Sequence, residues 1–179
     1  MGAVQTITER FEALRASAPA LALSSARSRA EKIRQMITAV LASKQRFYDA
    51  AHTELGAGDL DVAAQLVMLR SEGEYAIKNL ARWMRPRRVR NSAATLGKKC
   101  YIHCEPKGVI LNLSTWNAPV AIGLVPAIAA IAAGNAFALK PSELAPHSAT
   151  VLREVIESVF APAEFAVFEG GPEVAQALL

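Results

Sequence analysis

Two cysteines and one histidine lie within the segment KKCYIHCE at residues 98–105, and such side chains are common ligands of zinc. We predict a strand here. In a strand, Cys100 and Cys104 share one face and His103 points to the other. Four residues of strand also hold the two cysteine Cα atoms roughly 13 Å apart, which is outside disulfide range. The spacing therefore predicts structural cysteines and no metal site.

Other patterns typical of catalytic or nucleotide-binding sites are scarce. The sequence contains no G-x-S-x-G serine elbow, no Walker A loop and no G-x-G-x-x-G dinucleotide fingerprint. Gly170 and Gly171 precede Pro172 at an expected helix start that follows a strand, where a cofactor can approach the backbone. These patterns alone predict a nucleotide-fold-like α/β domain behind a helical segment.

The composition is that of a globular chain. Of the 179 residues, 52% are hydrophobic and 20% are charged, which excludes a wholly disordered chain. The two cysteines exclude a disulfide scaffold and favour a reducing compartment. The N-terminal residues include acids and no long apolar run, so no secretory signal is expected. We therefore expect a cytoplasmic protein.

The net charge of +4 is unevenly distributed, because residues 78–99 hold eight of the 20 basic residues and no acid. The eight are Lys78, Arg82, Arg85, Arg87, Arg88, Arg90, Lys98 and Lys99. A local basic patch is weaker evidence for nucleic-acid binding than a domain that is basic throughout. Trp83 and Tyr101 are the only aromatic residues near it, which is poor for base stacking. We expect no nucleic-acid partner.

Helical periodicity dominates the chain before Pro86. One apolar stripe has helical spacing from Ile33 to Leu41, and a second runs from Val62 to Met84. The first helical region is expected to end at Gly56 and Gly58. We predict an N-terminal helical segment at residues 1–86.

After Pro86 the pattern changes to strands. Residues 87–105 predict two short strands around a turn, and residues 106–179 alternate short apolar runs with helical segments. The expected strands are Gly108–Leu113, Ala136–Leu139 and Phe165–Phe168. Such alternation predicts right-handed βαβ units and a parallel sheet. Residues 109–139 carry no charge before Lys140, but prolines, glycines and asparagines interrupt the run, so no membrane span is expected.

Two longer stretches, YIHCEPKGVILNLSTWNAP and PAIAAIAAGNAFALKPSELAP, resemble the aldehyde dehydrogenase superfamily. The likeness is greatest to the branch that contains coniferyl aldehyde dehydrogenase and the class-three enzymes, and it extends over essentially the whole chain. The W-N-x-P, A-A-G-N and K-P-S-E blocks carry it. The resemblance implies an α/β fold in which N-terminal helices and a β-hairpin precede half of a Rossmann-like parallel sheet, as in a truncated aldehyde dehydrogenase.

The resemblance also assigns roles to residues of the first block. The Asn of W-N-x-P, here Asn117, would donate its amide to the oxyanion that forms when a thiol attacks the aldehyde. Ser114, Thr115 and Trp116 would line the nicotinamide side of the cofactor through their backbone. Thr115 departs from the proline that is common in the superfamily, a departure shared with the class-three branch.

The second block implies a cofactor site for NAD or NADP. Lys140 and Glu143 would bind the hydroxyls of the adenosine ribose, and a charged donor and acceptor three residues apart suit a diol. Gly170 and Gly171 would lie near the adenine.

The family's nucleophilic cysteine and general-base glutamate lie downstream of the region that these residues resemble. Cys100 and Cys104 precede W-N-x-P and match neither. We therefore expect the N-terminal part of an NAD(P)-dependent enzyme that oxidises an aldehyde, for which an aromatic, coniferyl-aldehyde-like one is a candidate, to the acid. The chain alone is expected to be inactive and the complete protein to be a homo-oligomer. A non-catalytic pseudoenzyme and one part of a split protein remain alternatives. We also expect Gly108–Leu113 to form an exposed edge of the sheet.

Overall fold

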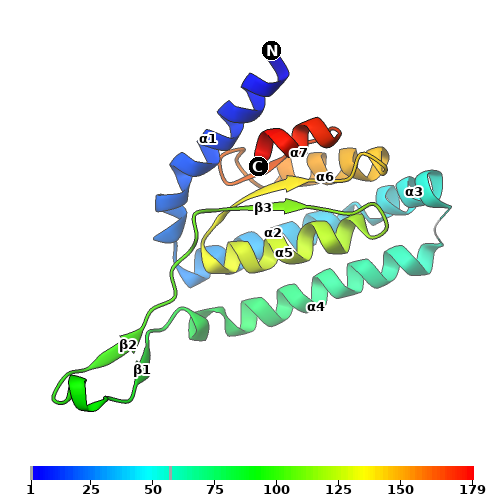
Figure 1. Ribbon diagram of the computed structural model, residues 1–179. Coiled ribbons are helices and arrows are strands. Elements are labelled where there is room, and N and C mark those ends of the chain that lie inside the picture. Colours follow the sequence, from blue (N-terminus) through cyan, green and yellow to red (C-terminus); the bar gives the residue numbers. More distant parts are fainter. Residues whose placement is uncertain (1, 57) are drawn as a thin grey trace.

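The computed structural model describes residues 2–56 and 58–179, and within them the chain forms seven α-helices, one 3-10 turn and five strands (Figure 1). The N-terminal helices are α1 (Gly2–Ala22), α2 (Ala26–Ala42), α3 (Lys44–Leu55) and α4 (Asp59–Trp83). The hairpin strands are β1 (Arg87–Val89) and β2 (Cys100–Ile102). The remaining elements are β3 (Val109–Leu113), α5 (Pro119–Ala133), β4 (Ala136–Lys140), α6 (Pro146–Glu157), β5 (Phe165–Val167) and α7 (Pro172–Leu178).

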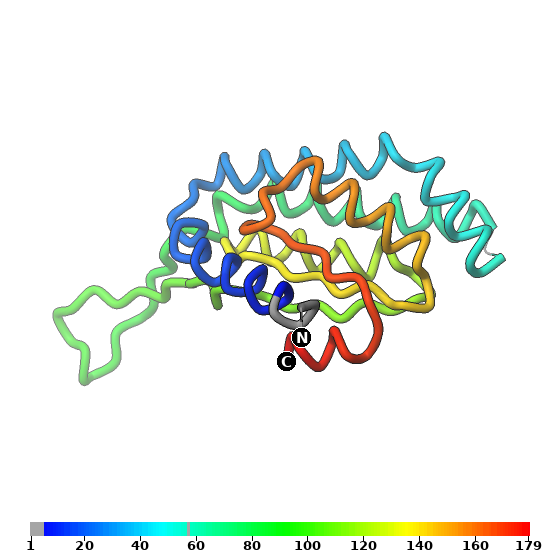
Figure 2. The backbone as a smooth tube through the Cα atoms, turned by 90° about the horizontal axis from the view of Figure 1, so that it is seen from above, coloured from blue at the N-terminus to red at the C-terminus, as the bar shows by residue number. Residues whose placement is uncertain are grey.

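The main sheet is parallel and has the strand order β3-β4-β5, so the predicted βαβ arrangement is confirmed. In the central strand β4, successive side chains enter two different cores. Phe137 and Leu139 pack among helices α2, α5 and α6, whereas Ala136 and Ala138 face α1 and α7. Figure 2 shows α1 and α7 together on one side of the sheet. Helices thus cover both faces, which explains why β4 is an uninterrupted apolar run before Lys140.

Strand β3 pairs only with β4 among the described strands and therefore forms one edge of the sheet, as predicted. Its residues from Val109 to Asn112 are half-buried, and Leu113 is exposed. The residues of β4 and β5, in contrast, are all buried. The unpaired side of β3 presents backbone N–H and C=O groups that another strand could pair with.

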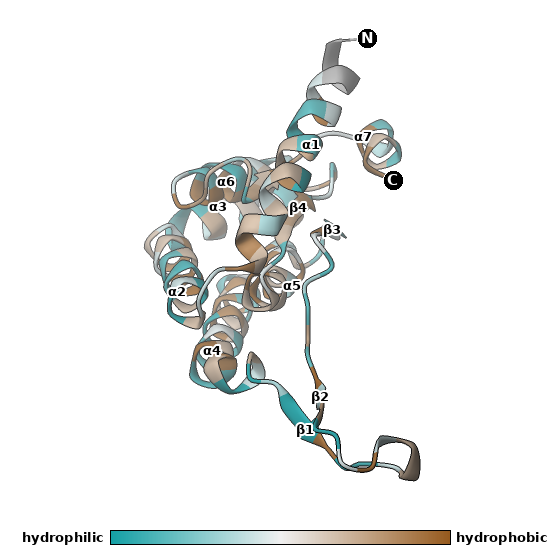
Figure 3. Cartoon of the chain, turned by 90° about the vertical axis from the view of Figure 1, so that its left-hand side faces the viewer, coloured by the Kyte–Doolittle hydropathy of each residue, from teal (hydrophilic) through white to brown (hydrophobic). Residues whose placement is uncertain are grey.

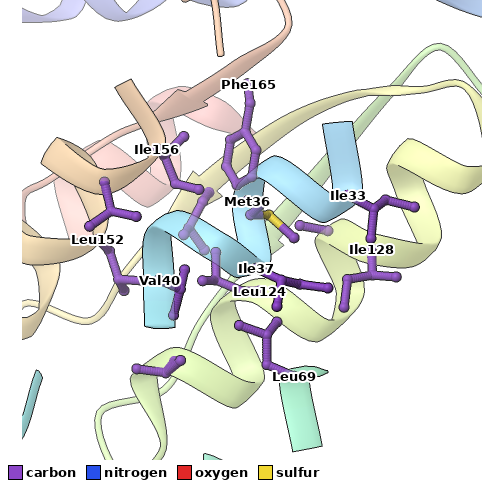
Figure 4. Close-up of a cluster of buried hydrophobic side chains, with 14 of the residues drawn as sticks. Ile33, Met36, Ile37, Val40, Leu69, Leu124, Ile128, Leu152, Ile156 and Phe165 are labelled. Carbon is purple, nitrogen blue, oxygen red and sulfur yellow. The ribbon is translucent and has the colours of Figure 1, made fainter. Parts of the chain in front are cut away.

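The larger core joins the N-terminal helices to the sheet (Figure 4). Ile33, Met36, Ile37 and Val40 of α2 are buried in it, which confirms the first apolar stripe. They pack with α5, α6 and β5 residues that include Leu124, Ile128, Leu152 and Phe165. Helix α4 approaches α2 closely at Gly73, where a Cβ atom would lie 2.2 Å from Ile37 Cδ1. A side chain at position 73 would therefore require the Ile37 side chain to move.

The boundaries of the N-terminal helices differ from the prediction at one place. The helical region before Gly56 is two helices, because α2 ends at Ala42 and α3 begins at Lys44. Gly56 ends α3 with a left-handed φ of 58°, which a residue with a side chain rarely adopts. Helix α4 ends at Trp83, before the proline at position 86. The apolar stripes predicted the helices correctly, but they carry no signal for the short break at Ser43.

The β1–β2 hairpin extends from the body of the molecule (Figure 3). Its two strands pair antiparallel, as predicted. Strand β2, however, ends at Ile102, so the prediction of one strand from Cys100 through Cys104 is wrong.

Within the described residues, no group of three or more His, Cys, Asp or Glu side chains could hold a metal ion. No helix in the described part of the chain has the length and apolar character that crossing a membrane requires.

The A-A-G-N block, which links α5 to β4, makes structural contacts. Gly134 ends α5 with a φ of 86°, and a Cβ atom there would lie 2.5 Å from the Arg29 guanidinium. Arg29 is buried and donates to the carbonyl oxygens of Ala22 and Ala132 at 2.8 and 3.0 Å, which ties the C-terminal ends of α1 and α5 together. Burial lowers its pKa, because removal from water disfavours the charged form. Asn135 accepts a hydrogen bond from the Gly108 amide at 2.9 Å and so fixes the start of β3.

Candidate active site

Two loops leave the sheet side by side at the carboxyl ends of adjacent strands. Residues 114–118 follow β3, and residues 141–145 follow β4. Leu113 and Lys140 are partners in the β3–β4 register, and the Ser114 amide donates to the Lys140 carbonyl at 2.9 Å. In parallel α/β sheets this edge is where ligands bind. The sheet therefore brings the W-N-x-P and K-P-S-E blocks together at the carboxyl ends of its strands.

The loop after β3 holds Asn117 in a defined orientation. The Thr115 hydroxyl donates to Asn117 Oδ1 at 2.7 Å, and both side chains are exposed. Because the carboxamide oxygen accepts this bond, the Asn117 NH₂ group remains available to donate to a ligand. Ser114 is buried at the base of the loop, and Trp116 is 47% exposed. The loop thus presents an oriented hydrogen-bond donor at the surface, which an oxyanion site requires.

The loop after β4 holds an ion pair that is partly buried. Lys140 is only 5% exposed, and its ammonium group is paired with the Glu143 carboxylate. The hydrogen bond from Lys140 lowers the pKa of Glu143, and a backbone hydrogen bond lowers it further. Glu143 is therefore ionised at neutral pH. An ammonium group has three donors and a carboxylate has two acceptor oxygens, so both partners keep hydrogen-bonding capacity for a diol.

A hollow of about 260 Å³ lies beside this ion pair. Its lining consists of Pro141, Ser142, Glu143, Pro146, Ala149, Thr150, Glu169, Gly170 and Gly171. The structure thus places three of the predicted cofactor residues around one space, namely Glu143 and the two glycines. Ligand pockets for whole drug-sized molecules hold about 300–1,000 Å³, so this hollow has the size for part of a dinucleotide.

Glycine is required at position 170, whereas a side chain at position 171 would have to displace the Glu173 carboxylate. Gly170 has a φ of 138°, and a Cβ atom there would lie 2.4 Å from Val174 Cγ2. A Cβ atom on Gly171 would lie 2.6 Å from Glu173 Oε2. The backbone at Gly170 and Gly171 therefore carries no side chain where it borders the hollow, which permits the close approach of a flat ring. These observations fit the adenosine half of NAD or NADP.

The predicted residues fall into two groups at this edge. Lys140, Glu143, Gly170 and Gly171 lie at or next to the hollow. The residues from Ser114 to Asn117 do not line it; they form the neighbouring loop, and the Ser114–Lys140 hydrogen bond joins the two groups.

Two polar residues near these loops escaped the sequence analysis. Gln65 of α4 accepts hydrogen bonds from the amides of Val120 and Ala121 at the start of α5. Glu54 of α3 accepts hydrogen bonds from Ser148 at the start of α6. One signal pointed to them: both helices begin with Ala-Pro and lack the Ser, Thr, Asp or Asn that normally caps a helix. An acceptor from elsewhere in the chain was therefore to be expected.

Comparison with known proteins identifies relatives of this chain. A sequence model of the aldehyde dehydrogenase family matches residues 2–179. Aldehyde dehydrogenase family 3 member H1 of Arabidopsis thaliana is 38% identical over 131 residues, which are 73% of this chain and 27% of that protein. The Canis lupus familiaris protein named aldehyde dehydrogenase, dimeric NADP-preferring, is 39% identical over 115 residues, 64% of this chain and 25% of its own length. The chain thus spans about a quarter of the length of these two relatives.

Solved structures resemble the fold as well. The structure described as the substrate-bound state of Staphylococcus aureus AldH has a TM-score of 0.90 at 29% identity, and the match covers 96% of this chain and 38% of that one. HpcC from Thermus thermophilus has a TM-score of 0.85 at 20% identity, covering 98% of this chain and 34% of that chain, and shows the fold alone. The predicted arrangement of N-terminal helices, hairpin and parallel α/β sheet is confirmed by these matches.

Proposed function

The chain belongs to the aldehyde dehydrogenase family, and we propose that it contributes the oxyanion donor and part of the dinucleotide site to an enzyme that oxidises an aldehyde to a carboxylic acid. The overall reaction consumes the aldehyde, water and NAD or NADP, and it yields the acid, the reduced dinucleotide and a proton. A cysteine nucleophile and a glutamate base would come from sequence outside these 179 residues. An aromatic, coniferyl-aldehyde-like compound is our candidate substrate.

The orientation of Asn117 is the observation that carries this proposal. Attack of a thiolate on an aldehyde carbon turns the carbonyl oxygen into an oxyanion. A preoriented donor stabilises that charge in the transition state more than it stabilises the neutral aldehyde. Asn117 meets this need because its carboxamide oxygen is occupied by Thr115 and its NH₂ group is not held by that bond.

Lys140, Glu143 and the glycine-lined hollow would hold the adenosine half of the dinucleotide. The bound dinucleotide supplies an acceptor for the hydride that the aldehyde carbon loses. Lys140 would donate to a ribose hydroxyl and the Glu143 carboxylate would accept from one. Their ion pair keeps both groups oriented when no ribose is present. The relative named as NADP-preferring is consistent with use of either dinucleotide.

The test compares this chain with the protein encoded by the complete reading frame that contains it, which we term the complete gene product. We expect the complete gene product to form NADH or NADPH from an aromatic aldehyde, and a thiol-blocking reagent to abolish that activity. The 179-residue chain should form neither, because positioning groups without a nucleophile do not support covalent catalysis. Aldehyde-dependent activity of the chain alone, absent from a mock purification, would contradict this assignment.

A second candidate is that the chain is one part of a split protein or a non-catalytic binding module. The edge position of β3 favours the split protein, because its unpaired side suits a further strand from another polypeptide. Detection of a separate reading frame that encodes the family's cysteine and glutamate would select the split protein. A stop codon with no such frame would select the non-catalytic module.

We further propose that residues 1–86, 87–105 and 106–179 are the helical, hairpin and nucleotide-binding parts, and that the hairpin contributes to a homo-oligomer. A cytoplasmic location remains our expectation. Sedimentation of the complete gene product with and without the hairpin residues 90–99 would test the oligomer. The hairpin tip lies outside both hydrophobic cores, so its removal should leave the fold intact.

A further inference from the structure

Helices α5 and α6 begin in the same unusual way. Their N-cap residues are Ala118 and Ala145, with φ and ψ near −144° and 62° in one and −130° and 61° in the other. Each is followed by a proline at the first helical position. The first amides of an α-helix have no partner within the helix, and a capping side chain usually accepts from one of them. Alanine has no atom that can do so.

Side chains from two other helices replace the missing caps. Gln65 Oε1, from α4, accepts from the Val120 amide at 3.1 Å and from the Ala121 amide at 3.3 Å. Glu54, from α3, accepts from the Ser148 amide at 2.9 Å through Oε1 and from the Ser148 hydroxyl at 2.7 Å through Oε2. Glu54 lies near the end of α3 and Gln65 near the start of α4, so both belong to one helix junction. Figure 1 shows the C-terminal end of α3 and the N-terminal end of α4 at the same end of the molecule as the loop between β3 and α5.

We propose that Gln65 and Glu54 are positioning residues, each for a different loop of the site. Gln65 fixes the start of α5 and with it the loop that carries Asn117. Glu54 fixes the start of α6 and with it the loop that carries Glu143, the partner of Lys140 at the end of β4. The meaning of these positions for catalysis rests on the proposed function, which this assignment deepens.

The short chain between each cap and its loop makes the coupling tight. Only Ala118 and Pro119 separate Asn117 from the first amide that Gln65 holds. The proline ring fixes its own φ, which leaves this connection little freedom. On the other side, Glu54 binds both the amide and the hydroxyl of Ser148, which is 1% exposed. A shift at either cap therefore passes directly to the loop that precedes the helix.

The first test measures amide hydrogen exchange by NMR in the 179-residue chain. Gln65→Met keeps the length of the side chain but removes the acceptor, so exchange at Val120 and Ala121 should become about fivefold faster while Ser148 is unchanged. Glu54→Met should have the converse effect, faster exchange at Ser148 only. Gln35→Met is the matched control, because Gln35 is an exposed α2 residue whose amide donates to Glu31, and it should change neither site.

Conservative variants separate capping from packing. Gln65→Glu and Glu54→Gln each keep an oxygen acceptor at the same distance along the side chain, and both should retain the slow exchange. If these variants lose as much protection as the methionine variants, or if each methionine variant loosens both helix starts equally, the assignment is overturned. Should Gln65→Met fail to fold, the same comparison is made between Gln65→Glu and Gln65→Ala.

The second test measures kinetics in the complete gene product. Gln65→Met should lower kcat about fivefold with little change in the KM for the dinucleotide, and Glu54→Met should raise that KM by a similar factor with little change in kcat. Equal changes of kcat and of the dinucleotide KM in both variants would contradict the assignment of Gln65 and Glu54 to different loops. A complete gene product without dehydrogenase activity would refute the proposed function. The amide exchange measurements would still show whether Gln65 and Glu54 cap the two helices.

Discussion

The loops that follow β3 and β4 start from paired residues of one sheet, yet they differ in burial and in how their polar groups are satisfied. At the end of β4, Lys140 is buried and already paired with Glu143 of the loop that follows. In the loop after β3, Asn117 is exposed and is oriented by Thr115. The charged groups of Lys140 and Glu143 are thus paired with each other within this chain. The loop after β3, in contrast, presents the Asn117 hydrogen-bond donor at the surface. We infer that the nucleotide side is preformed here and that the oxyanion side is completed by other residues.

The largest effect is expected for the Asn117→Ala variant of the complete gene product. Loss of one oxyanion donor should lower kcat about 100- to 1,000-fold, with little change in dinucleotide affinity, because the oxyanion exists only after attack. Steady-state kinetics and dinucleotide titration measure the two quantities. Weaker dinucleotide binding at an unchanged kcat would show that Asn117 belongs to the nucleotide side instead.

The Lys140→Met variant probes the other loop. Methionine fills the buried space of the lysine stem but cannot donate, so dinucleotide affinity should fall about 10- to 100-fold, the usual range for hydrogen bonds to charged groups. Titration with NAD and NADP measures the loss. Lys107→Met provides a control, because this exposed lysine precedes β3 at the opposite end of the strand. Equal losses in both variants would argue against a specific role for Lys140.

A smaller effect is expected from Thr115→Val, which has nearly the same shape and lacks the hydroxyl. Without its hydrogen bond the Asn117 carboxamide can rotate, so kcat should fall about five- to tenfold. Thr115→Ser keeps the hydroxyl and should stay near the parent value. If valine and serine behave alike, the hydroxyl does not orient Asn117.

The smallest effect concerns pH. The pKa of Glu143 is lowered in the folded chain from its ordinary value of 4.5, so its ion pair favours the folded state above that value. This contribution is lost as the pH falls through the lowered pKa. Thermal unfolding should therefore show a slightly steeper loss of stability between about pH 5 and pH 3 for the parent chain than for Glu143→Gln. Glu72→Gln, an exposed change on α4, is the control and should follow the parent chain.

Local patterns in the sequence were enough to predict most of the fold. Apolar spacing predicted α2 and α4, and short apolar runs bounded by glycine or proline predicted β3, β4 and β5. These signals succeed because burial repeats with the period of the element. The position of the two loops followed from the same alternation, since parallel strands place their carboxyl ends at one edge.

Contacts between distant segments could not be predicted in this way. Arg29, Glu54 and Gln65 are polar residues in helices, and nothing beside them in the sequence shows that their partners lie in α5 or α6. The Thr115–Asn117 hydrogen bond was missed for another reason. It depends on the backbone path of an irregular loop, which residue types alone do not define.

The guanidinium of Arg29 also has a consequence for the order of events on the ribosome. Its partners at Ala22 and Ser24 are made before it, but the carbonyl of Ala132 follows 103 residues later. At about 5–20 residues per second, translation of that interval lasts roughly 5 to 20 seconds. During this time the apolar face of α2 also lacks its contacts with α5, because Ile33 and Met36 share a core with Leu124 and Ile128. The nascent N-terminal helices thus emerge with unburied apolar surface, the kind of surface that chaperones bind.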